Sequence, residues 1–464
     1  MHYFTRFFKK HTGTTVVIAD INQIARDFTF GHQGGVLDMN GNSMVWNNDT
    51  TDVAASGFTI HALDESAIVA NLKADTTTTL TWTQGGQQTF LGSFADNGKD
   101  SRMQFVYDGG SGSKLTLNSI YTSLTTKGSG MVVNSGTLTL VGTHTVHGAG
   151  SANGKNANRY FNDKDWHYAD AASDVTVKNG AIFELGSHAR LTGDVVVERG
   201  GTFLLRESVQ HAQEYIEGGQ RLESTAAIAD FHGHKGNVSL ADNAWLRIEY
   251  NEGVTADASY AASITGSGNM YVDLKDASLS LTLTGDSSFS GTKEVISGGV
   301  IGVTETALGD TDSNTWLIQR NAWIASHTDS AEKLLSRINS QSLGTLALST
   351  DTPEQLELSG HANLYVGAEK GKTVHYGAQG TSLTLAAVNG EWKLGGGGGE
   401  LVVHFRLSGD NDLLLGSGES SFGAVHLGNL MNDFTGDILF NSSGIKLTYT
   451  AGALGNANLS LLYG

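Results

Sequence analysis

Short runs with apolar residues at alternate positions recur along the whole chain, and each run ends at glycine, asparagine, aspartate or serine. Clear examples lie at 112–120, 130–142, 173–186, 193–205, 236–250 and 269–285. Alternation with a period of two is typical of a strand that buries one face, and the residues after each run favour tight turns. The pattern therefore predicts a chain that is almost entirely β.

A longer repeat favours a parallel solenoid over an antiparallel sandwich. Residues 283–310 match residues 430–456, and both contain an F-S/T-G motif, glycine turns between two strands and an A-L-G closure. The matched structural positions are Phe289, Gly291, Gly298, Gly299, Leu308 and Gly309 in the first copy, and Phe434, Gly436, Gly444, Leu454 and Gly455 in the second. Such a unit cannot bury its apolar face alone, so the units must stack.

Glycine and proline usage fits stacked coils. The chain has 60 glycines and one proline, Pro353. A strand paired on both sides needs the backbone N–H that proline lacks, whereas the turns need the positive φ angles that glycine adopts. At about 20–25 residues per coil, the chain would form about 18–22 coils. We therefore predict a single right-handed parallel β-helix.

Interruptions in the strand rhythm suggest how the chain is organised. We expect an entry segment at 1–25, a β-helix stalk at 26–429, and C-terminal coils at 430–464. Projecting insertions are expected at 147–173, 206–236 and 315–343. The second insertion could hold a short helix, and Leu334, Leu335 and Ile338 in the third share one helical face. The run Gly395–Gly399 suggests a flexible crossing between coils.

Charge and cysteine content exclude several classes of function. The formal net charge of −18 disfavours binding to nucleic acid or to an anionic membrane surface. The chain has no cysteine, which excludes disulfides, thiolate metal sites and a cysteine nucleophile. A chain that crosses an oxidising compartment before it folds would avoid misplaced disulfides in this way.

These motifs resemble the passenger region of Gram-negative type V autotransporters. The repeat at 283–310 and 430–456 is similar to the strand repeat of many passengers. Residues 26–46, with GGVLDMNGNS at 34–43, and residues 165–197 resemble parts of the serine-protease autotransporter group. The resemblance implies a right-handed β-helix that an outer-membrane barrel carries to the cell surface, with the last coils, here 430–464, acting as a folding nucleus. Neither a protease domain nor barrel strands are recognisable in the sequence, so the resemblance transfers to the stalk alone.

Candidate catalytic and metal-binding residues all have a simpler explanation. Ser111 follows Gly110 where a trypsin-type nucleophile would follow aspartate, so a polar turn accounts for it. The pairs His144 with His147 and His232 with His234 are expected to be solvated loop residues. Acids that could cleave polysaccharides, such as Asp52, Asp64 and Asp75, lie in turn-like contexts. We therefore expect no catalytic residue, no metal and no cofactor.

One aromatic cluster is a candidate for binding. It consists of Tyr160, Phe161, Trp166, His167 and Tyr168 within the first insertion. Large aromatic side chains with polar groups are typical of interaction hot spots, although the same residues could instead pin a hairpin to the rod.

The function expected from these patterns is non-catalytic adhesion or self-association at the bacterial cell surface. The expected partners are identical rods on neighbouring cells or host glycans and proteins, together with the outer-membrane barrel during secretion. Two alternatives remain: the stalk of a secreted serine protease, and a β-helix enzyme that acts on polysaccharides.

Overall fold

The computed structural model describes residues 7–9, 15–20, 27–30, 34–46, 59–62, 67–118, 121–141, 169–186, 189–207, 213–217, 220–224, 234–310 and 315–461. The chain divides into two compact units, Met1–Arg247 and Ile248–Gly464. The boundary between them falls within strand β25 (Trp245–Tyr250).

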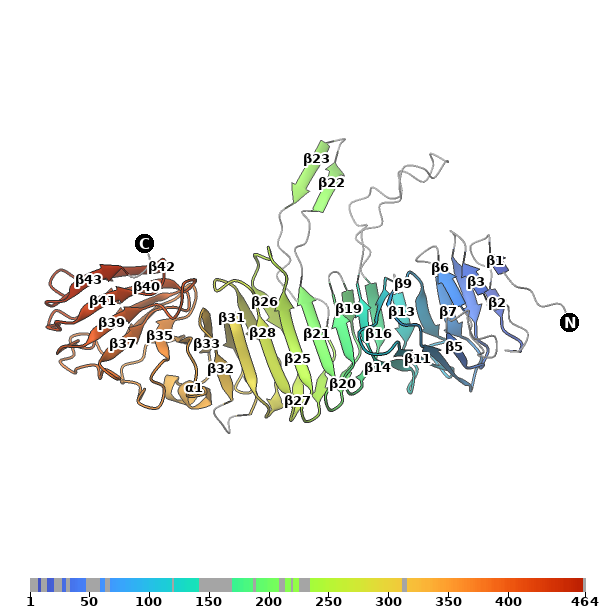
Figure 1. Cartoon of the computed structure of the whole chain (residues 1–464), viewed down its shortest axis with the longest axis horizontal. Coiled ribbons are helices and arrows are strands. Elements are labelled where there is room, and N and C mark those ends of the chain that lie inside the picture. Colours follow the sequence, from blue (N-terminus) through green and yellow to red (C-terminus); the bar gives the residue numbers. More distant parts are fainter. Residues whose placement is uncertain are drawn as a thin grey trace. The chain divides into compact units, whose positions relative to one another are not determined.

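Unit 1 is built from three parallel sheets whose strands follow one another in turn along the chain (Figure 1). The first sheet contains β2 (Thr15–Val17), β4 (Gly35–Asp38), β7 (Ala67–Asn71), β10 (Ser93–Asp96), β13 (Tyr121–Leu124), β16 (Ala169–Ser173) and β19 (Ala189–Leu191). The second contains β5 (Met44–Trp46), β8 (Thr77–Trp82), β11 (Arg102–Asp108), β14 (Gly130–Ser135), β17 (Val175–Val177), β20 (Val195–Val197) and β24 (Val238–Leu240). The third contains β9 (Gln87–Phe90), β12 (Lys114–Leu117), β15 (Thr137–Leu140), β18 (Ile182–Leu185) and β21 (Thr202–Glu207).

A small parallel sheet near the start of unit 1 contains β1 (Phe7–Lys9), β3 (Asp27–Phe30) and β6 (Thr59–Ala62).

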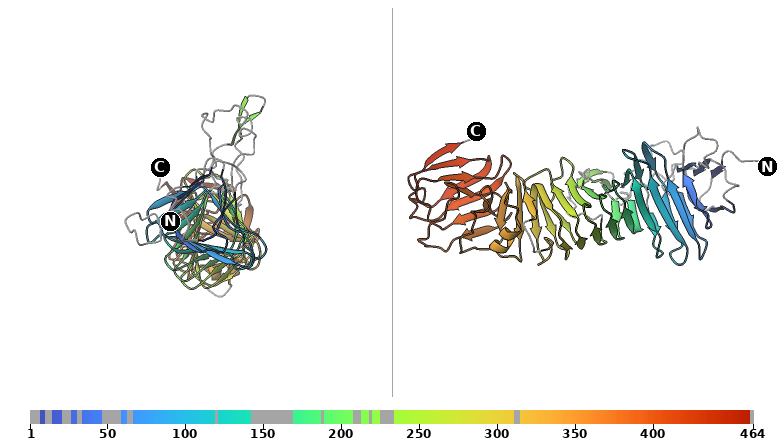
Figure 2. Two further views of the ribbon diagram at one scale, coloured as in Figure 1. Left: turned by 90° about the vertical axis from the view of Figure 1, so that its right-hand side faces the viewer. Right: turned by 60° about the horizontal axis from the view of Figure 1, so that its bottom comes forward.

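The three main sheets show how the coils of unit 1 are built. Within the described residues of this unit, each coil from β7 onwards supplies one strand to each main sheet, and successive coils lie side by side (Figure 2).

The core of unit 1 is made of columns of apolar side chains in parallel register. One column in the third sheet runs through Phe90, Leu117, Leu140, Leu185 and Leu205. Each of these side chains is at most 3% exposed. Full burial of a leucine or phenylalanine contributes about 1.5–3 kcal/mol, so a strand out of register would lose this contribution at every coil.

Unit 2 is also built from parallel strands, with one long sheet and shorter ones. The long parallel sheet contains β26 (Ala258–Tyr260), β29 (Ser280–Leu283), β31 (Lys293–Gly302), β33 (Ala322–Ser326), β34 (Thr345–Leu348), β35 (Tyr365–Ala368), β37 (Glu391–Leu394), β39 (Asp412–Leu415), β41 (Asp437–Phe440) and β43 (Asn458–Leu461). A four-stranded sheet contains β36 (Thr373–Tyr376), β38 (Glu400–Val403), β40 (Phe422–Leu427) and β42 (Gly444–Tyr449). The remaining strands are β27 (Ile264–Gly266), β28 (Asn269–Asp273), β30 (Ser288–Phe289) and β32 (Trp316–Ile318). The later coils of unit 2 thus alternate between two sheets.

The prediction of an all-β parallel β-solenoid is confirmed. The structure has about 15 turns, fewer than the 18–22 expected. The difference arises because the spacing between stacked strands is uneven. Phe183 and Phe203 are register partners 20 residues apart, whereas Leu138 and Phe183 are 45 residues apart.

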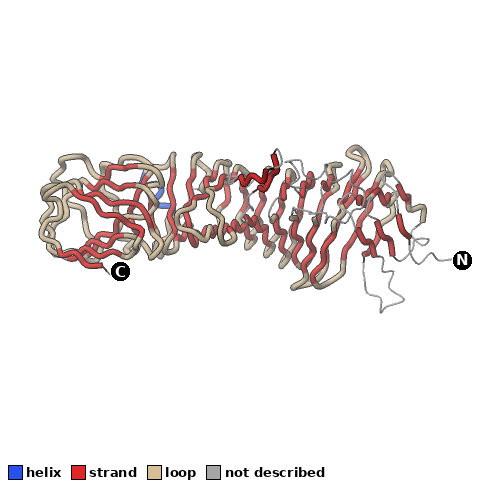
Figure 3. Tube along the Cα trace, turned by 90° about the horizontal axis from the view of Figure 1, so that it is seen from above, coloured by secondary structure: helices blue, strands red, loops and turns tan. Residues whose placement is uncertain are grey.

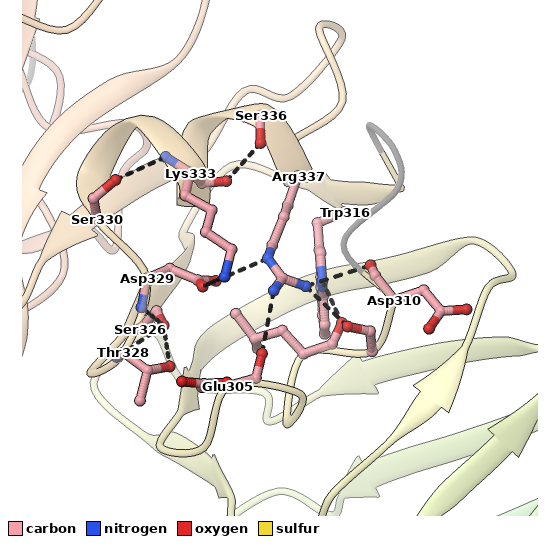
Figure 4. Close-up of polar contacts among 12 residues, drawn as sticks. Glu305, Asp310, Trp316, Ser326, Thr328, Asp329, Ser330, Lys333, Ser336 and Arg337 are labelled. Carbon is pink, nitrogen blue, oxygen red and sulfur yellow. Dashed lines mark hydrogen bonds and ion pairs between the residues drawn. The ribbon is translucent and has the colours of Figure 1, made fainter.

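The single helix among the described residues, α1 (Ala331–Arg337), anchors a turn of the neighbouring coil (Figure 3). Its last residue, Arg337, is 1% exposed and forms an ion pair with the buried carboxylate of Asp329, at 2.8 Å. The guanidinium also donates to the carbonyl oxygens of Gly309 (2.9 Å) and Glu305 (3.4 Å). Lys333 forms an ion pair with the other oxygen of Asp329 (Figure 4). The charges therefore hold the helix against the turn that closes the first sequence repeat.

The glycines of the F-S/T-G motif allow close contact between coils. A Cβ atom at Gly291 would lie 2.0 Å from the carbonyl oxygen of Gly268, and one at Gly436 would lie 2.1 Å from that of Asn411. Any larger residue would push the coils apart.

The closing residues of the two repeats also correspond. The N–H of Asp310 donates to the carbonyl of Phe289, and that of Asn456 donates to Phe434. Gly309 and Gly455, one residue earlier, have φ angles of 82° and 61°. Both repeats therefore close with the same backbone hydrogen bond.

The described residues differ from two local expectations. Within 206–236, they contain an antiparallel hairpin of β22 (Gln213–Glu217) and β23 (Gln220–Ser224), and no helix occurs among them (Figure 1). The two residues between these strands are glycines, the pattern that favours a tight hairpin over a helix.

The run Gly395–Gly399 is not a flexible crossing. Most of its residues are buried, and its N–H groups donate to Val366 and Ala368. A Cβ atom at Gly396 would lie 2.5 Å from Oγ1 of Thr345. The glycines are required because the backbone packs directly on neighbouring strands.

The side chain of Lys293, the first residue of β31, points into the core of unit 2. The matching position in the second repeat is Ile438, and Lys293 stands in register between Met270 and Trp316. Its side chain is fully buried, and Nζ donates to Gly291 O (3.2 Å) and Thr315 Oγ1 (3.1 Å). Burial, together with the nearby charge of Arg337, lowers the pKa of Lys293 to about 8. The charged amine is thus destabilised in the folded state.

We predict that Lys293→Met stabilises unit 2. A pKa lowered from 10.5 to about 8 corresponds to a cost of about 3 kcal/mol at neutral pH, partly offset by the two hydrogen bonds that the variant loses. We expect a gain of about 1–3 kcal/mol at pH 7 in urea unfolding. The gain should shrink between pH 8 and 10.5, because the wild-type amine becomes neutral first in the folded state. Lys446→Met, at an exposed site in β42, should change little. Equal gains at pH 7 and pH 10 would contradict the assignment.

Candidate interaction surface

The outward face of the second sheet of unit 1 carries a continuous row of small, uncharged side chains. Each strand contributes one register-matched residue, and six of the seven are β-branched. We call this set the β-branched row: Val45, Thr81, Val106, Val132, Thr176, Val196 and Ser239.

The row faces outward, but its exposure is uneven, since Val106 in its middle is only 9% exposed. Val196 is 44% exposed, whereas its neighbours Val195 and Val197 on the same strand are fully buried. Val45, at the other end, is 45% exposed. Four members of the row are valines, and two are threonines. Val and Thr fit this position because β-branched side chains pack well against each other on a pleated surface.

Charges of opposite sign lie along the edge where these strands begin. Arg102 and Lys127 are exposed at the start of β11 and in the turn before β14. Asp174 and Asp194 are exposed just before β17 and β20. The edge is therefore basic over two coils and acidic over the next two. The turn before β11 also holds Lys99 and Asp100, whose opposite charges offset each other.

Hydrogen bonds between coils hold the acidic side chains in place. Oδ1 of Asp174 accepts from the backbone N–H of Asp194 (3.0 Å), and Oδ1 of Asp194 accepts from the backbone N–H of Asn237 (2.7 Å). Each turn thus caps the next one, and both carboxylates keep fixed positions beside the row.

The third sheet of unit 1 has a different exterior. Glu184 is 8% exposed although it faces outward, and it forms ion pairs with Lys114 (2.9 Å) and Arg206 (3.0 Å). Burial alone would raise the pKa of Glu184, but the hydrogen bond and charge of Lys114, with help from Thr139 and Arg206, lower it. This carboxylate is fully engaged within the sheet.

The predicted aromatic binding cluster lies outside the described residues. This applies to Tyr160, Phe161, Trp166, His167 and Tyr168, and the cluster remains a prediction.

The candidate catalytic residues are dispersed. Ser111 is exposed in the turn between β11 and β12, and Asp75 lies in another turn with a φ angle of 56°. Asp52 and Asp64 lie outside the described residues. The structure therefore brings no two of these candidates together among the residues it describes.

The expectation of a solvated loop histidine is wrong for His234. This residue is 4% exposed, and its Nε2 lies 3.1 Å from the carbonyl oxygen of Gly193. The ring packs edge-on against Phe203. Burial lowers the pKa of His234 to about 4. His144, His147 and His232 lie outside the described residues.

Two further histidines pair across the four-stranded sheet of unit 2. Nδ1 of His375 lies 2.8 Å from Nε2 of His404, and the ring planes differ by 7° with centroids 5.0 Å apart. Rings this far apart with nitrogens this close lie edge to edge, so the contact is an N–H···N hydrogen bond. Burial of His404 and the nearby His375 and His426 lower the pKa of His404. In the described part of the chain, no three histidine, aspartate or glutamate side chains form a group that could hold a metal ion.

Comparisons with known proteins identify no relative. No family model, curated protein or solved structure matches the chain. Helix α1 has seven residues, and the described part of the chain contains no helix with the length and apolarity needed to cross a bilayer.

We predict that His234 makes unit 1 sensitive to acid. Its folded pKa of about 4 lies below the usual 6.5, so its contribution to stability is complete above pH 6.5 and declines as the pH falls. The loss should approach about 3 kcal/mol near pH 4. In urea unfolding at a series of pH values, His234→Gln should flatten this decline, because glutamine stays neutral. His61→Gln, at an exposed site in β6, should leave it intact. An unchanged decline in His234→Gln would disprove the assignment.

Proposed function

We propose that this chain is a non-catalytic autotransporter passenger, displayed on the bacterial cell surface, that mediates adhesion through self-association. The observation that carries the proposal is the uncharged β-branched row on the surface of a chain with a net charge of −18. The parallel solenoid supports the passenger assignment, and the similarity of residues 26–46 to known passengers supports the surface location.

The row favours contact between two copies because it avoids the main cost of bringing them together. Two copies of a strongly acidic chain repel each other. Where they meet along uncharged side chains, the row itself places no carboxylate in the contact. Valine and threonine side chains on facing rows can then bury apolar surface, at about 25 cal/mol per Å².

The charged edge favours one direction of pairing. If a second copy runs antiparallel across a two-fold axis between β14 and β17, β11 faces β20 and β14 faces β17 of the other copy. Arg102 then lies opposite Asp194, and Lys127 lies opposite Asp174. Parallel pairing about a two-fold axis along the row would instead place the beginning of each strand opposite the end of its counterpart, so these charges would not meet.

A single contact of this kind is weak, and adhesion would rely on many of them. With strands about 4.8 Å apart, seven strands give a row about 29 Å long. A stable interface buries about 800 Å² on each partner. A row of this length that is one residue wide covers a smaller area. Many copies on two facing cells would act together, so that weak contacts add to strong attachment.

We predict that lysine substitutions in the row abolish self-association. Val132→Lys and Val196→Lys each place a charge in the contact and should weaken association about tenfold or more in sedimentation velocity. Thr89→Lys places the same charge at an exposed position of the third sheet and should have no such effect. Higher salt should strengthen wild-type association, because it screens the repulsion between acidic copies.

The same variants displayed on cells should reduce cell–cell aggregation in the same order. A wild-type chain that remains monomeric at every salt and protein concentration would refute self-association. Equal weakening by Val196→Lys and Thr89→Lys would refute the assignment of the row.

A further inference from the structure

A two-residue turn in unit 2 connects Val388 to Glu391, the first residue of β37. The N–H of Val388 donates to Glu391 O (2.9 Å), and the N–H of Glu391 donates to Val388 O (3.1 Å). The residues between them, Asn389 and Gly390, are exposed and have φ angles of 54° and 83°. Positive φ at both central positions identifies a type I′ turn. This turn therefore presents an Asn–Gly pair to solvent.

An Asn–Gly pair can react with itself. The backbone nitrogen of the glycine attacks Cγ of the asparagine, and the absence of a glycine Cβ leaves the approach open. The five-membered ring closes only when this nitrogen lies on the same side of the Cα–C bond as Cβ. That arrangement requires an asparagine ψ of about −120°, far from the value of about +30° in a type I′ turn.

A flip of one peptide unit supplies the required angle. Rotating only the peptide between Asn389 and Gly390 converts the turn to type II′, in which the first central residue has ψ of about −120°. Both turn types connect paired strands, so the hydrogen bonds between Val388 and Glu391 remain. Neither the N–H of Gly390 nor the carbonyl oxygen of Asn389 has a hydrogen-bond partner among the described residues. The flip therefore breaks no hydrogen bond there, and backbone strain at Asn389 keeps the flipped turn a minor state.

Three other Asn–Gly pairs lie in the described part of the chain, and each has its peptide unit held in place. The glycine N–H donates in every one of them: Gly41 to Asn71 Oδ1 (3.0 Å), Gly98 to Asp96 Oδ1 (2.8 Å) and Gly180 to Gly200 O (3.0 Å). A flip at these sites must first break that hydrogen bond. Loss of one such bond should slow the reaction about threefold to tenfold.

We propose that Asn389 is a site of spontaneous covalent modification. Hydroxide removes the N–H proton of Gly390, and the nitrogen attacks Cγ of Asn389. The bond from Cγ to the side-chain nitrogen breaks, and this nitrogen takes a proton from water and leaves as ammonia. Water then opens the succinimide ring at either carbonyl, which gives aspartate or isoaspartate. Both products add one negative charge to the exposed turn.

The isoaspartate product also changes the backbone. Its main chain runs through the former side chain and gains one carbon atom between Val388 and Glu391. The carbonyl oxygen of Gly390 accepts from the N–H of Asp412 (2.9 Å), at the start of β39. A longer turn displaces this carbonyl, so the modification loosens the first contact between β37 and β39 in aged copies of the protein.

Peptide mapping by mass spectrometry of the full chain tests the site. Samples are kept in warm, mildly alkaline buffer, either folded or in urea, and the conversion of each Asn–Gly pair is followed over time. Dividing each folded rate by the rate of the same pair in urea removes the influence of flanking residues. This ratio should be about threefold to tenfold higher for Asn389 than for Asn179. Asn389→Gln should abolish conversion at this position, because a larger ring closes much more slowly, and should leave Asn179 unchanged.

Equal ratios for Asn389 and Asn179 would overturn the proposal. So would a folded chain in which Asn389 stays intact while the same residue converts in urea. A conversion rate at Asn389 that does not rise with pH would contradict attack by the deprotonated nitrogen of Gly390.

Discussion

Hydrogen bonding on both sides of nearly every strand is the constraint on which this structure depends. In a parallel solenoid, each strand must match the register of the coil before it and the coil after it. An error in one coil would turn its apolar side chains outward and propagate to the next. The aligned column from Phe90 to Leu205 shows the result. The same constraint explains why Pro353, the single proline, lies outside the strands.

The strand alternation and the glycine turns were enough to predict the fold class, because both follow from local chemistry. Features that depend on contacts between coils could not be predicted in this way. Gly291 is small because the carbonyl of Gly268 lies against it, and the Gly395–Gly399 run is buried because it packs on β34 and β35. The hairpin at 213–224 did have a local signal in Gly218 and Gly219, which the expectation of a helix overlooked.

The candidate surface was even harder to predict from the sequence than these glycine positions. The members of the β-branched row are separated by as few as 20 residues, between Thr176 and Val196, and by as many as 44, between Val132 and Thr176. No fixed period connects them, so only the observed register identifies them as neighbours. His361 is a similar case. Its neighbours in sequence give no sign that Nε2 would lie 3.0 Å from the carbonyl oxygen of Ile338 while Nδ1 is buried.

Buried cations in unit 2 add specificity to a chain whose repeats resemble each other. Coils with similar sequences could exchange places, because the apolar columns accept either one. In another coil, Lys293 would lose its hydrogen bonds to Gly291 O and Thr315 Oγ1. Ile438, at the matching position of the second repeat, has no polar group that needs such partners. Arg337 likewise needs Asp329 and the carbonyl of Gly309 at once. A buried charge without its partners is strongly destabilising, so both residues penalise an exchanged coil, even though Lys293 adds no stability to the correct one.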